Sequence, residues 1–332
     1  MRLLRKILIP FAAIYYLVTS IRNTCYNKGF LKSKTYDFPV IVVGNLNVGG
    51  TGKSPMVEYL INLLKNHYRL ATLSRGYKRK TKGFFLADQN TKTSDIGDEP
   101  MQFYRKFPEL HVAVDEDRQH GISGLREQVN PEVIVLDDAF QHRRVEGGLN
   151  IMLTAYKDFF YDDYLLPVGN LRESRQGAQR SDIVIVTKCP DSLSQETRNT
   201  IKNKINKYTD STVFFSKIAY RNVVMNETSE IALNQLLKFT LVTGIANPKP
   251  LINYLKSKGL QFESKVYGDH HNFSYEEIDS LRKEKLIITT EKDYVRLKDE
   301  LTNCYYLPIQ ASFLDRGELL NEIVLNFCAS GV

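Results

Sequence analysis

The sequence predicts an α/β protein built on an open, mostly parallel β-sheet. The run FPVIVVGN at 38–45 is typical of a buried strand, and apolar residues from Pro55 to Lys65 recur at helical spacing. Most of the other strand-like runs are rich in Val, Ile or Leu without clear alternation, as strands buried on both faces of a parallel sheet are. These further strands are expected at 70–74, 133–136, 150–154 and 182–187.

The composition changes after about residue 205, where Lys- and Asn-rich connections separate shorter strand-like runs. Strands are expected there at 212–220, 239–246, 262–267 and 286–290. A chain of 332 residues is near the length at which a single core stops growing. We therefore expect an N-terminal basic amphipathic segment at 1–35, a core domain at 36–208 and a smaller C-terminal α/β domain at 209–332 that closes over the active site.

The overall composition is that of a globular protein. Charged residues make up 25% of the chain and no tract is compositionally biased, which argues against a disordered or fibrous class. The four cysteines are far apart, with no pair at metal-binding or redox spacing. They are typical of reduced cysteines in a cytosolic protein.

Positive charge is concentrated at the N-terminus. The net charge is +7, and no acidic residue precedes Asp37. The basic residues before it are Arg2, Arg5, Lys6, Arg22, Lys28, Lys32 and Lys34. Such a segment favours an anionic partner. No nucleic-acid recognition motif accompanies it, so an anionic lipid surface is preferred and no nucleic-acid partner is expected.

An apolar run of twelve residues, ILIPFAAIYYLV at 7–18, lies within this basic segment. It is too short to cross a bilayer, which needs roughly 20 apolar residues. Its basic flanks and the pair Tyr15 and Tyr16 favour a helix lying in the membrane interface. A helix docked on the protein's own core and a cleaved secretory signal are the alternatives, although no convincing cleavage site follows.

The strongest motif is GNLNVGGTGKSP at 44–55, between the first strand and the following helix. Its glycines allow backbone N–H groups to face phosphates, and the helix N-terminus favours their negative charge. The predicted nucleotide contacts are Asn47, Gly49, Gly50, Thr51, Gly52, Lys53 and Ser54. Lys53 would reach the β- and γ-phosphates of ATP and Ser54 would bind Mg²⁺, whereas Asn47 replaces the first glycine of the usual pattern. A glycine turn without a ligand is the alternative.

The fold class expected is therefore a P-loop NTPase-type parallel sheet with a second, smaller α/β domain and an N-terminal membrane-surface helix. In such a sheet the segment EVIVLDDAFQHR at 132–143 places Asp137 and Asp138 at the carboxyl edge, where ligands bind. At least one of the two is expected to hold Mg²⁺, although a capping or turn role is common for Asp. Gln141 follows near the same edge.

Two further segments carry polar residues that suit catalysis. GDEP at 97–100 provides Asp98 and Glu99 before a helix; Asp98 is either a helix cap or the base that accepts a substrate proton. YGDHHNF at 267–273 follows a strand of the second domain. Neighbouring histidines point in different directions, and no zinc-type ligand set accompanies them, so one catalytic or orienting histidine is expected.

In these motifs the sequence resembles the tetraacyldisaccharide 4′-kinase family of Gram-negative bacteria. The resemblance runs along nearly the whole chain, from the basic apolar N-terminus to the C-terminal third. Besides the motifs above it includes SRGY at 74–77, LLPVGNLRES at 165–174, VTGIANP at 242–248, DHH at 269–271 and TTEKDYVRL at 289–297. Several signatures in order are more specific than one phosphate loop.

The resemblance implies ATP and Mg²⁺ as cosubstrate and cofactor, and a lipid-linked disaccharide, a tetraacylated glucosamine disaccharide 1-phosphate, as acceptor of a phosphate on its 4′-hydroxyl. It implies the cytoplasmic face of the bacterial inner membrane, and no obligate protein partner is inferred. It assigns Asp98 as catalytic base and His270 as its partner. It likens Arg118, Gln141, Arg172 and Glu173 to residues that line the nucleotide or lipid-phosphate site. The candidate metal ligands are Ser54, Asp137, Asp138, Glu99 and Glu173.

The sequence departs from the family pattern at three positions. Ser54 stands where Thr is commoner, but it retains the hydroxyl for Mg²⁺. Ala139 replaces a common Gly, which predicts a negative φ or slight strain there, and Ser174 replaces a common Pro in a loop. A membrane-recruited P-loop ATPase switch is the alternative function, although such a switch has no need of the GDEP and DHH segments.

Overall fold

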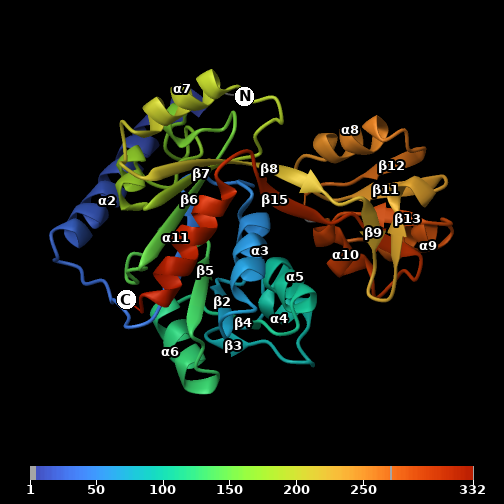
Figure 1. Cartoon of the computed structure of the whole chain (residues 1–332), viewed down its shortest axis with the longest axis horizontal. Helices are drawn as coiled ribbons and strands as arrows, with labels where there is room; N and C mark the ends of the chain where they lie inside the picture. The colour runs from blue at the N-terminus through green and yellow to red at the C-terminus, as the bar shows by residue number, and fades with distance from the viewer. Residues whose placement is uncertain (1–4, 270, 332) are drawn as a thin grey trace. The chain divides into compact units, whose positions relative to one another are not determined.

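The computed structural model describes residues 5–269 and 271–331, apart from the side chain of Lys6. The chain divides into two compact units (Figure 1). The smaller unit is Ala219–Gln310, and the larger one combines the chain up to Ile218 with the residues from Ala311 onward. The smaller domain was expected to span all of 209–332, but the residues from Ala311 onward belong to the larger unit.

A mostly parallel sheet forms the core of the larger unit. Within the described residues it has nine strands in the order β15-β8-β7-β6-β1-β5-β2-β4-β3. β1 (Val40–Asn45) lies at the centre, parallel to β5 (Val133–Asp137) and β6 (Leu149–Ala155), which flank it. The other strands are β2 (Leu70–Ser74), β3 (Phe85–Leu86), β4 (His111–Val114), β7 (Ile183–Thr187), β8 (Thr212–Tyr220) and β15 (Ile309–Phe313). The predicted parallel sheet is confirmed, and the carboxyl ends of β1, β5 and β7 share one edge.

Four strands of this sheet differ from expectation: β3, β4 and β15 were not predicted, and β8 was assigned to the other domain. β4 was not predicted, because HVAV is only four residues long and its pairing with β2 comes from tertiary contact. β8 was expected in the second domain, but it pairs in parallel with β7. The chain leaves the larger unit within β8 and returns to it within β15.

Helices surround the sheet of the larger unit. They are α2 (Ile9–Asn27), α3 (Lys53–Leu64), α4 (Thr93–Ile96), α5 (Asp98–Lys106), α6 (Arg118–Gln128), α7 (Gln195–Ile205) and α11 (Gly317–Ala329). Short 3₁₀ turns lie at Lys6–Leu8, Phe160–Asp162 and Arg175–Arg180. α3 and α11 run side by side in Figure 1, and the Tyr59 hydroxyl donates to Asn321 Oδ1 at 2.6 Å. This contact joins the C-terminal helix to the helix that follows the glycine-rich loop.

The smaller unit has its own sheet and core. Within the described residues its strand order is β10-β9-β14-β13-β11-β12. The strands are β9 (Val223–Met225), β10 (Glu230–Ala232), β11 (Phe239–Thr243), β12 (Phe262–Val266), β13 (Ile287–Thr289) and β14 (Cys304–Tyr306). The helices are α8 (Lys249–Ser257), α9 (Tyr275–Arg282) and α10 (Glu291–Leu297), with a 3₁₀ turn at Leu233–Gln235. Leu241, Leu255 and Ile288 are buried together, so this unit has a hydrophobic core of its own.

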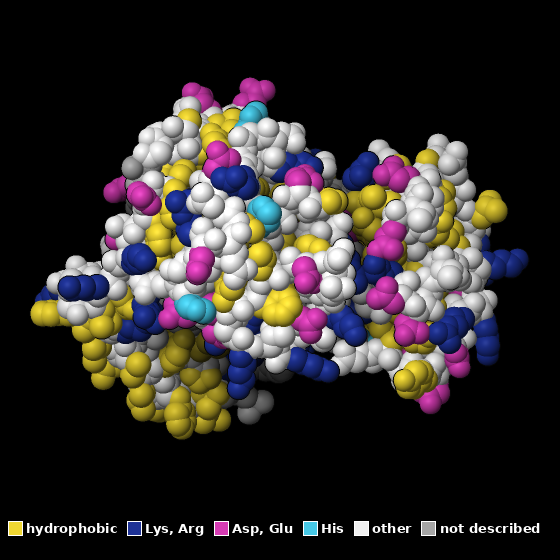
Figure 2. Space-filling view, turned by 90° about the horizontal axis from the view of Figure 1, so that it is seen from below, with side chains coloured by type: hydrophobic (Ala, Val, Ile, Leu, Met, Phe, Trp, Pro, Cys, Tyr) yellow, Lys and Arg dark blue, Asp and Glu magenta, His cyan; other side chains and the backbone are white. Residues whose placement is uncertain are grey.

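Most of the N-terminal apolar run lies in the first half of α2, a helix of 19 residues with Pro10 in its first turn. None of its described residues is buried. Its large apolar side chains are exposed instead: Ile9, Phe11, Ile14, Leu17, Val18 and Ile21. Figure 2 shows hydrophobic side chains gathered on the part of the surface that this helix forms, at the lower left. Within the described part of the chain, no helix has the length and apolarity needed to cross a membrane.

Candidate nucleotide site

The glycine-rich segment links β1 to α3 as predicted. Gly49 and Gly52 adopt left-handed φ angles of 107° and 84°, and Gly52 caps the N-terminus of α3. L-residues with a Cβ rarely adopt this conformation, so glycine is needed at both positions. Lys53 and Ser54 then begin the helix, whose first N–H groups have no intrahelical acceptor. The loop and the helix N-terminus together suit a phosphate group.

Asn47 is tolerated at a position where the usual motif has glycine, because it is not among the residues with positive φ. Its side-chain Nδ2 donates to Asp163 Oδ2 at 3.0 Å, and its backbone bridges to Leu171. Val48 N also donates to the Asn170 carbonyl at 2.7 Å. The LLPVGNLRES segment and Asp163 just before it therefore hold the start of the glycine-rich loop by hydrogen bonds.

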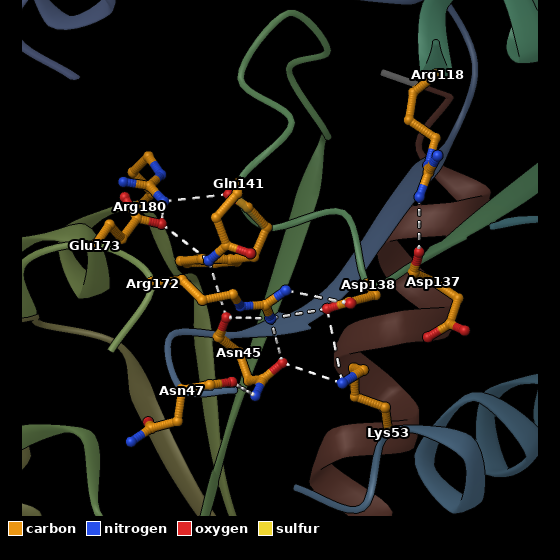
Figure 3. Close-up of polar contacts among 11 residues, drawn as sticks. Asn45, Asn47, Lys53, Arg118, Asp137, Asp138, Gln141, Arg172, Glu173 and Arg180 are labelled. Atoms are coloured by element: carbon orange, nitrogen blue, oxygen red, sulfur yellow. Dashed lines mark hydrogen bonds and ion pairs between the residues drawn. The ribbon is translucent and has the colours of Figure 1, made fainter. Parts of the chain in front are cut away.

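Asn45, the last residue of β1, joins the loop to the charged groups around it (Figure 3). Its side chain is fully buried, and its Oδ1 accepts hydrogen bonds from Lys53 Nζ at 3.2 Å and from Arg172 Nη2 at 2.6 Å. Lys53 Nζ also lies 3.7 Å from Asp138 Oδ1. Arg172 binds Asp138 through both terminal nitrogens, at 2.8 and 3.2 Å. Lys53 thus contacts one negatively charged group, the Asp138 carboxylate, and one neutral polar group, the Asn45 amide, beside the glycine-rich loop.

Asp138 is stabilised in its ionised form. Burial opposes its charge, but the Lys53 ammonium and the Arg172 guanidinium outweigh burial and lower its pKa to about 2. Its backbone has a left-handed φ of 49°. Ala139, where strain was considered, is not among the residues with positive φ. The chain therefore makes its turn after β5 at Asp138, and the alanine is accommodated there.

Asp137 has the opposite environment. Only 3% of the residue is exposed, and its Oδ1 is buried without a hydrogen-bond partner. Burial, together with the negative charges of Glu99 and Asp138, raises its pKa to about 7, although Lys53 opposes this effect. A buried carboxylate oxygen without a donor is costly unless a cation or a proton satisfies it.

GDEP approaches the same place from α5. Gly97 (φ 91°) is the N-cap of this helix, and a Cβ there would lie 2.7 Å from the Tyr77 carbonyl oxygen. Asp98 is the first helical residue, so the capping role considered for it belongs to Gly97. Glu99 Oε1 accepts a hydrogen bond from the Ser54 hydroxyl at 2.9 Å. The first turn of α5 therefore meets the first turn of α3.

Ser54, Glu99 and Asp137 form the part of the site that suits a divalent cation. The described residues contain no cluster of three or more His, Cys, Asp or Glu side chains that could hold a metal by themselves. Mg²⁺ does not need such a cluster, because it usually binds through one or two protein oxygens, substrate phosphates and water. The unsatisfied Asp137 Oδ1 and the Ser54 hydroxyl fit that requirement.

Glu173 does not fit the expected role of metal ligand. It is 3% exposed, and its two oxygens accept hydrogen bonds from Asn23, Gln141 and Arg180 at 2.8, 3.0 and 2.7 Å. Burial raises its pKa, but the Arg180 charge and these donors leave the pKa below its usual value. Its lone pairs are committed to protein donors, so we assign it to the support of the site.

Arg118 and Gln141 also donate to backbone carbonyls next to the site. Arg118, the first residue of α6, is 2% exposed and donates to the backbone carbonyls of Asp115 and Asp137. Gln141 Nε2 donates to the Asn45 carbonyl at 2.9 Å, in addition to Glu173. Both side chains hold the backbone that carries the candidate phosphate and metal groups.

His270 lies outside the described residues, so the structure does not test its expected role. In the same segment His271 Nε2 lies 2.9 Å from Glu277 Oε2, and its ring stacks on Tyr267. The Arg296 guanidinium donates to the His271 carbonyl at 3.3 Å. The motifs DHH and TTEKDYVRL are thus in contact within the smaller unit.

Sequence reasoning missed Thr187 and Lys188 at the end of β7. The Thr187 hydroxyl donates to the Thr51 carbonyl at 2.6 Å, and Lys188 Nζ donates to the Gly50 carbonyl. These two residues hold the glycine-rich loop from the β7 side. They stand at the carboxyl end of a strand of the same parallel sheet, where ligands bind, and this position could have predicted their place near the loop. Asn45 was missed for a different reason: it appeared only as the end of the first strand.

The fold and this site define an α/β nucleotide-binding protein of the P-loop class. The family model described as "Tetraacyldisaccharide-1-P 4'-kinase" matches residues 4–328. The chain therefore belongs to the tetraacyldisaccharide-1-P 4′-kinase family.

Individual relatives agree with this membership. The chain is 50% identical to a tetraacyldisaccharide 4′-kinase of Flavobacterium johnsoniae, over 98% of each chain. It is 42% identical to one of Bacteroides thetaiotaomicron, over 98% of this chain and 93% of the relative. A crystal structure described as LpxK from Aquifex aeolicus in complex with ATP is similar to it with a TM-score of 0.82 and 32% identity, covering 98% of this chain and 99% of that one.

Proposed function

We propose that this protein transfers the γ-phosphate of ATP to the 4′-hydroxyl of a tetraacylated glucosamine disaccharide 1-phosphate, giving a bis-phosphorylated lipid A precursor. The observation that carries the proposal is the phosphate loop at the carboxyl edge of the sheet, with Lys53, Ser54 and Asp137 around it, in a chain of this family. The name of the relatives supports the choice of acceptor.

The loop and Lys53 would bind the phosphates of ATP. The N–H groups at the start of α3 would face the phosphate charge, and the Lys53 ammonium could exchange its contact with Asp138 for one with a phosphate oxygen. Arg172 keeps two hydrogen bonds to Asp138 when Lys53 leaves. Asp138 would therefore remain paired while Lys53 contacts a phosphate oxygen.

Ser54 and Asp137 would hold Mg²⁺, with Glu99 beside them. When bound, this ion would neutralise negative charge that develops on the phosphate oxygens during transfer. The elevated pKa of Asp137 fits this assignment, because a neighbouring cation would favour the ionised carboxylate that burial disfavours. Glu173 is left out because protein donors already occupy its oxygens.

Asp98 is the proposed general base. In the transfer, the acceptor oxygen forms a bond to the γ-phosphorus, the bond from that phosphorus to the β,γ-bridging oxygen breaks, and ADP leaves. The hydroxyl proton passes to Asp98, whose neighbour Glu99 binds Ser54 at the phosphate loop. The partnership of His270 with Asp98 rests on the family resemblance alone and stays a prediction.

The apolar face of α2 is proposed to lie in a lipid surface. Ile14, Val18 and Ile21 are each more than half exposed to water. The exposed basic residues Arg5, Lys28 and Lys32 flank this helix, and they suit anionic headgroups. A lipid surface can cover such an apolar face without specific contacts. It also contains the proposed acceptor. We propose the cytoplasmic face of the bacterial inner membrane as the location, since ATP is available there.

A transfer assay tests the proposed function. Purified full-length protein with [γ-³²P]ATP, Mg²⁺ and the tetraacylated disaccharide 1-phosphate in detergent micelles should yield labelled lipid, with one ADP formed for each phosphate transferred. ATP consumption that does not depend on the acceptor, without labelled lipid, would instead favour a P-loop ATPase switch.

A further inference from the structure

The polar face of α2 contacts the residues that support the nucleotide site. The Tyr15 hydroxyl donates to the Arg172 carbonyl at 2.7 Å. Asn23 Nδ2 donates to Glu173 Oε2 at 2.8 Å, so one helix binds two consecutive residues of the LLPVGNLRES segment. These contacts are spaced eight residues apart, which places Tyr15 and Asn23 on one side of the helix.

The same side of α2 is fixed by arginines. Arg22 donates to the Gln141 carbonyl at 2.6 Å. In return Arg143 donates to the Asn23 carbonyl at 2.8 Å and lies 4.9 Å from the centre of the Tyr26 ring. The residues after β5 and the residues before the 3₁₀ turn at Arg175–Arg180 are thus both tied to α2.

The contacts of α2 with Arg172 and Gln141 lead to Asn45 in one further step, and its contact with Glu173 does so in two. Gln141 Nε2 and Arg172 Nη2 both donate to the Asn45 carbonyl, each at 2.9 Å. Glu173 is linked to Asn45 through Gln141. Asn45 in turn accepts from Lys53 (Figure 3). A continuous set of hydrogen bonds therefore connects the N-terminal helix to the lysine of the phosphate loop.

We propose that Tyr15 and Asn23 are positioning residues for the nucleotide site, so that α2 orders the phosphate loop in addition to any role at a lipid surface. The buried Glu173 carboxylate makes Asn23 the sensitive member, because loss of its donor leaves a buried charge partly unsatisfied. Burial raises the pKa of Tyr15, which keeps its hydroxyl protonated and able to donate. This inference rests on the proposed function only in taking Lys53 and its loop as the ATP site.

Nucleotide affinity tests the proposal without any lipid acceptor. The Kd of a non-hydrolysable ATP analogue with Mg²⁺ is measured by calorimetry on the full chain in detergent micelles. Asn23→Ala should raise this Kd roughly 5-fold to 30-fold, as loss of a donor to a buried charge does. Tyr15→Phe, which removes a single oxygen atom, should raise it by a smaller factor. If both variants bind the analogue as wild type does, the proposal is overturned.

Thr19→Val is the matched control on the same helix. The Thr19 hydroxyl donates to the carbonyls of Tyr15 and Tyr16 within α2, at 2.8 and 3.2 Å. Its loss should leave the Kd within about two-fold of wild type, as for ordinary surface substitutions. A rise in Kd equal to that of Asn23→Ala would mean that only helix integrity matters, which contradicts the proposal.

A double-mutant cycle separates positioning through Glu173 from a general loss of structure. Glu173→Gln removes the charge that Asn23 satisfies. If Asn23 acts through Glu173, the Kd of the double variant for the ATP analogue should not exceed the higher of the two single-variant Kd values. Additive effects on Kd would overturn the relay. Failure of the proposed transfer to the lipid would leave these binding results unchanged, so the two proposals fail separately.

Discussion

Asp137 and Asp138 are adjacent at the end of β5, yet the structure shifts their pKa values in opposite directions. The left-handed φ of Asp138 turns its carboxylate toward Lys53 and Arg172, whereas Asp137 remains in the sheet with a buried oxygen that has no donor. The pair therefore combines a carboxylate that is ionised at neutral pH with one that needs a cation or a proton.

The first prediction concerns stability. The folded pKa of Asp137 is raised to about 7, so the folded state binds more protons than the unfolded state between roughly pH 4 and pH 7, and the free energy of unfolding falls as pH rises through this window. Asp137→Asn should remove that fall and raise the melting temperature at pH 7.5, without Mg²⁺ or nucleotide, by about 3 °C or more.

Asp138→Asn is the matched control in the same melting experiment. The pKa of Asp138 is lowered to about 2, so its stabilising effect is present above pH 4 and is lost as pH falls toward 2. This variant should melt below wild type at pH 7.5. Equal shifts of the two variants in one direction would show that the carboxylates do not have different environments.

Lys53→Ala should lower kcat/KM by at least about 10²-fold, because its ammonium would stabilise charge on the transferred phosphate. Its contacts with Asn45 and Asp138 are polar and partly exposed, and Arg172 keeps Asp138 paired. Because the Lys53 charge also favours the ionised forms of Asp137 and Asp138, the melting temperature should fall modestly, and the variant should remain folded at the assay temperature. Steady-state kinetics and a thermal melt check this prediction; kcat/KM within a few-fold of wild type would refute the assigned phosphate loop.

The β7 end of the loop gives another prediction. Thr187→Val and Lys188→Ala each remove a donor to a loop carbonyl, at Thr51 and Gly50 respectively. Each should raise the KM for ATP, by roughly 5-fold to 30-fold, and leave the KM for the lipid acceptor nearly unchanged. Initial rates with one substrate varied at a time measure both constants. A rise confined to the lipid KM would place these residues on the acceptor side.

The apolar face of α2 can be tested apart from its polar face. Replacing Ile14 and Val18 by Ser should reduce co-sedimentation with anionic vesicles by about 10-fold or more, since each side chain contributes apolar area to the interface. The KM for the lipid acceptor should rise more than that for ATP. Vesicle binding equal to wild type would assign this face to another partner.

Much of the larger unit could be predicted from the sequence because its signals are local. β2 was predicted at its observed bounds, and the strands carrying the phosphate loop and the acid pair were found within two residues, since buried parallel strands are continuous apolar runs. The loop could be located because glycines with positive φ are needed there.

The remainder depends on contacts distant in sequence. Nothing near Ser54 predicts its hydrogen bond with Glu99, and nothing near Asn23 predicts Glu173, 150 residues later. The sequence left three interpretations of the α2 segment open: a helix in a membrane interface, a helix on the protein's own core and a cleaved secretory signal. The structure shows that one face of α2 makes polar contacts with the protein and that the other face exposes apolar side chains. Neither a purely membrane-bound helix nor a purely core-docked helix describes both faces. Glu173 was a candidate metal ligand, and nothing in the sequence identifies the three donors that occupy its oxygens.

The central claim is transfer of phosphate from ATP to the lipid-linked disaccharide with Asp98 as base. The most direct measurement follows ³²P from [γ-³²P]ATP into the lipid, for wild type and for Asp98→Asn, with product analysis of the phosphorylated position. We predict acceptor-dependent labelling at the 4′-position, a kcat about 10²-fold to 10⁴-fold lower for the variant and little change in its KM for ATP. Label released as inorganic phosphate at the same rate with or without acceptor, or a variant as fast as wild type, would contradict the account.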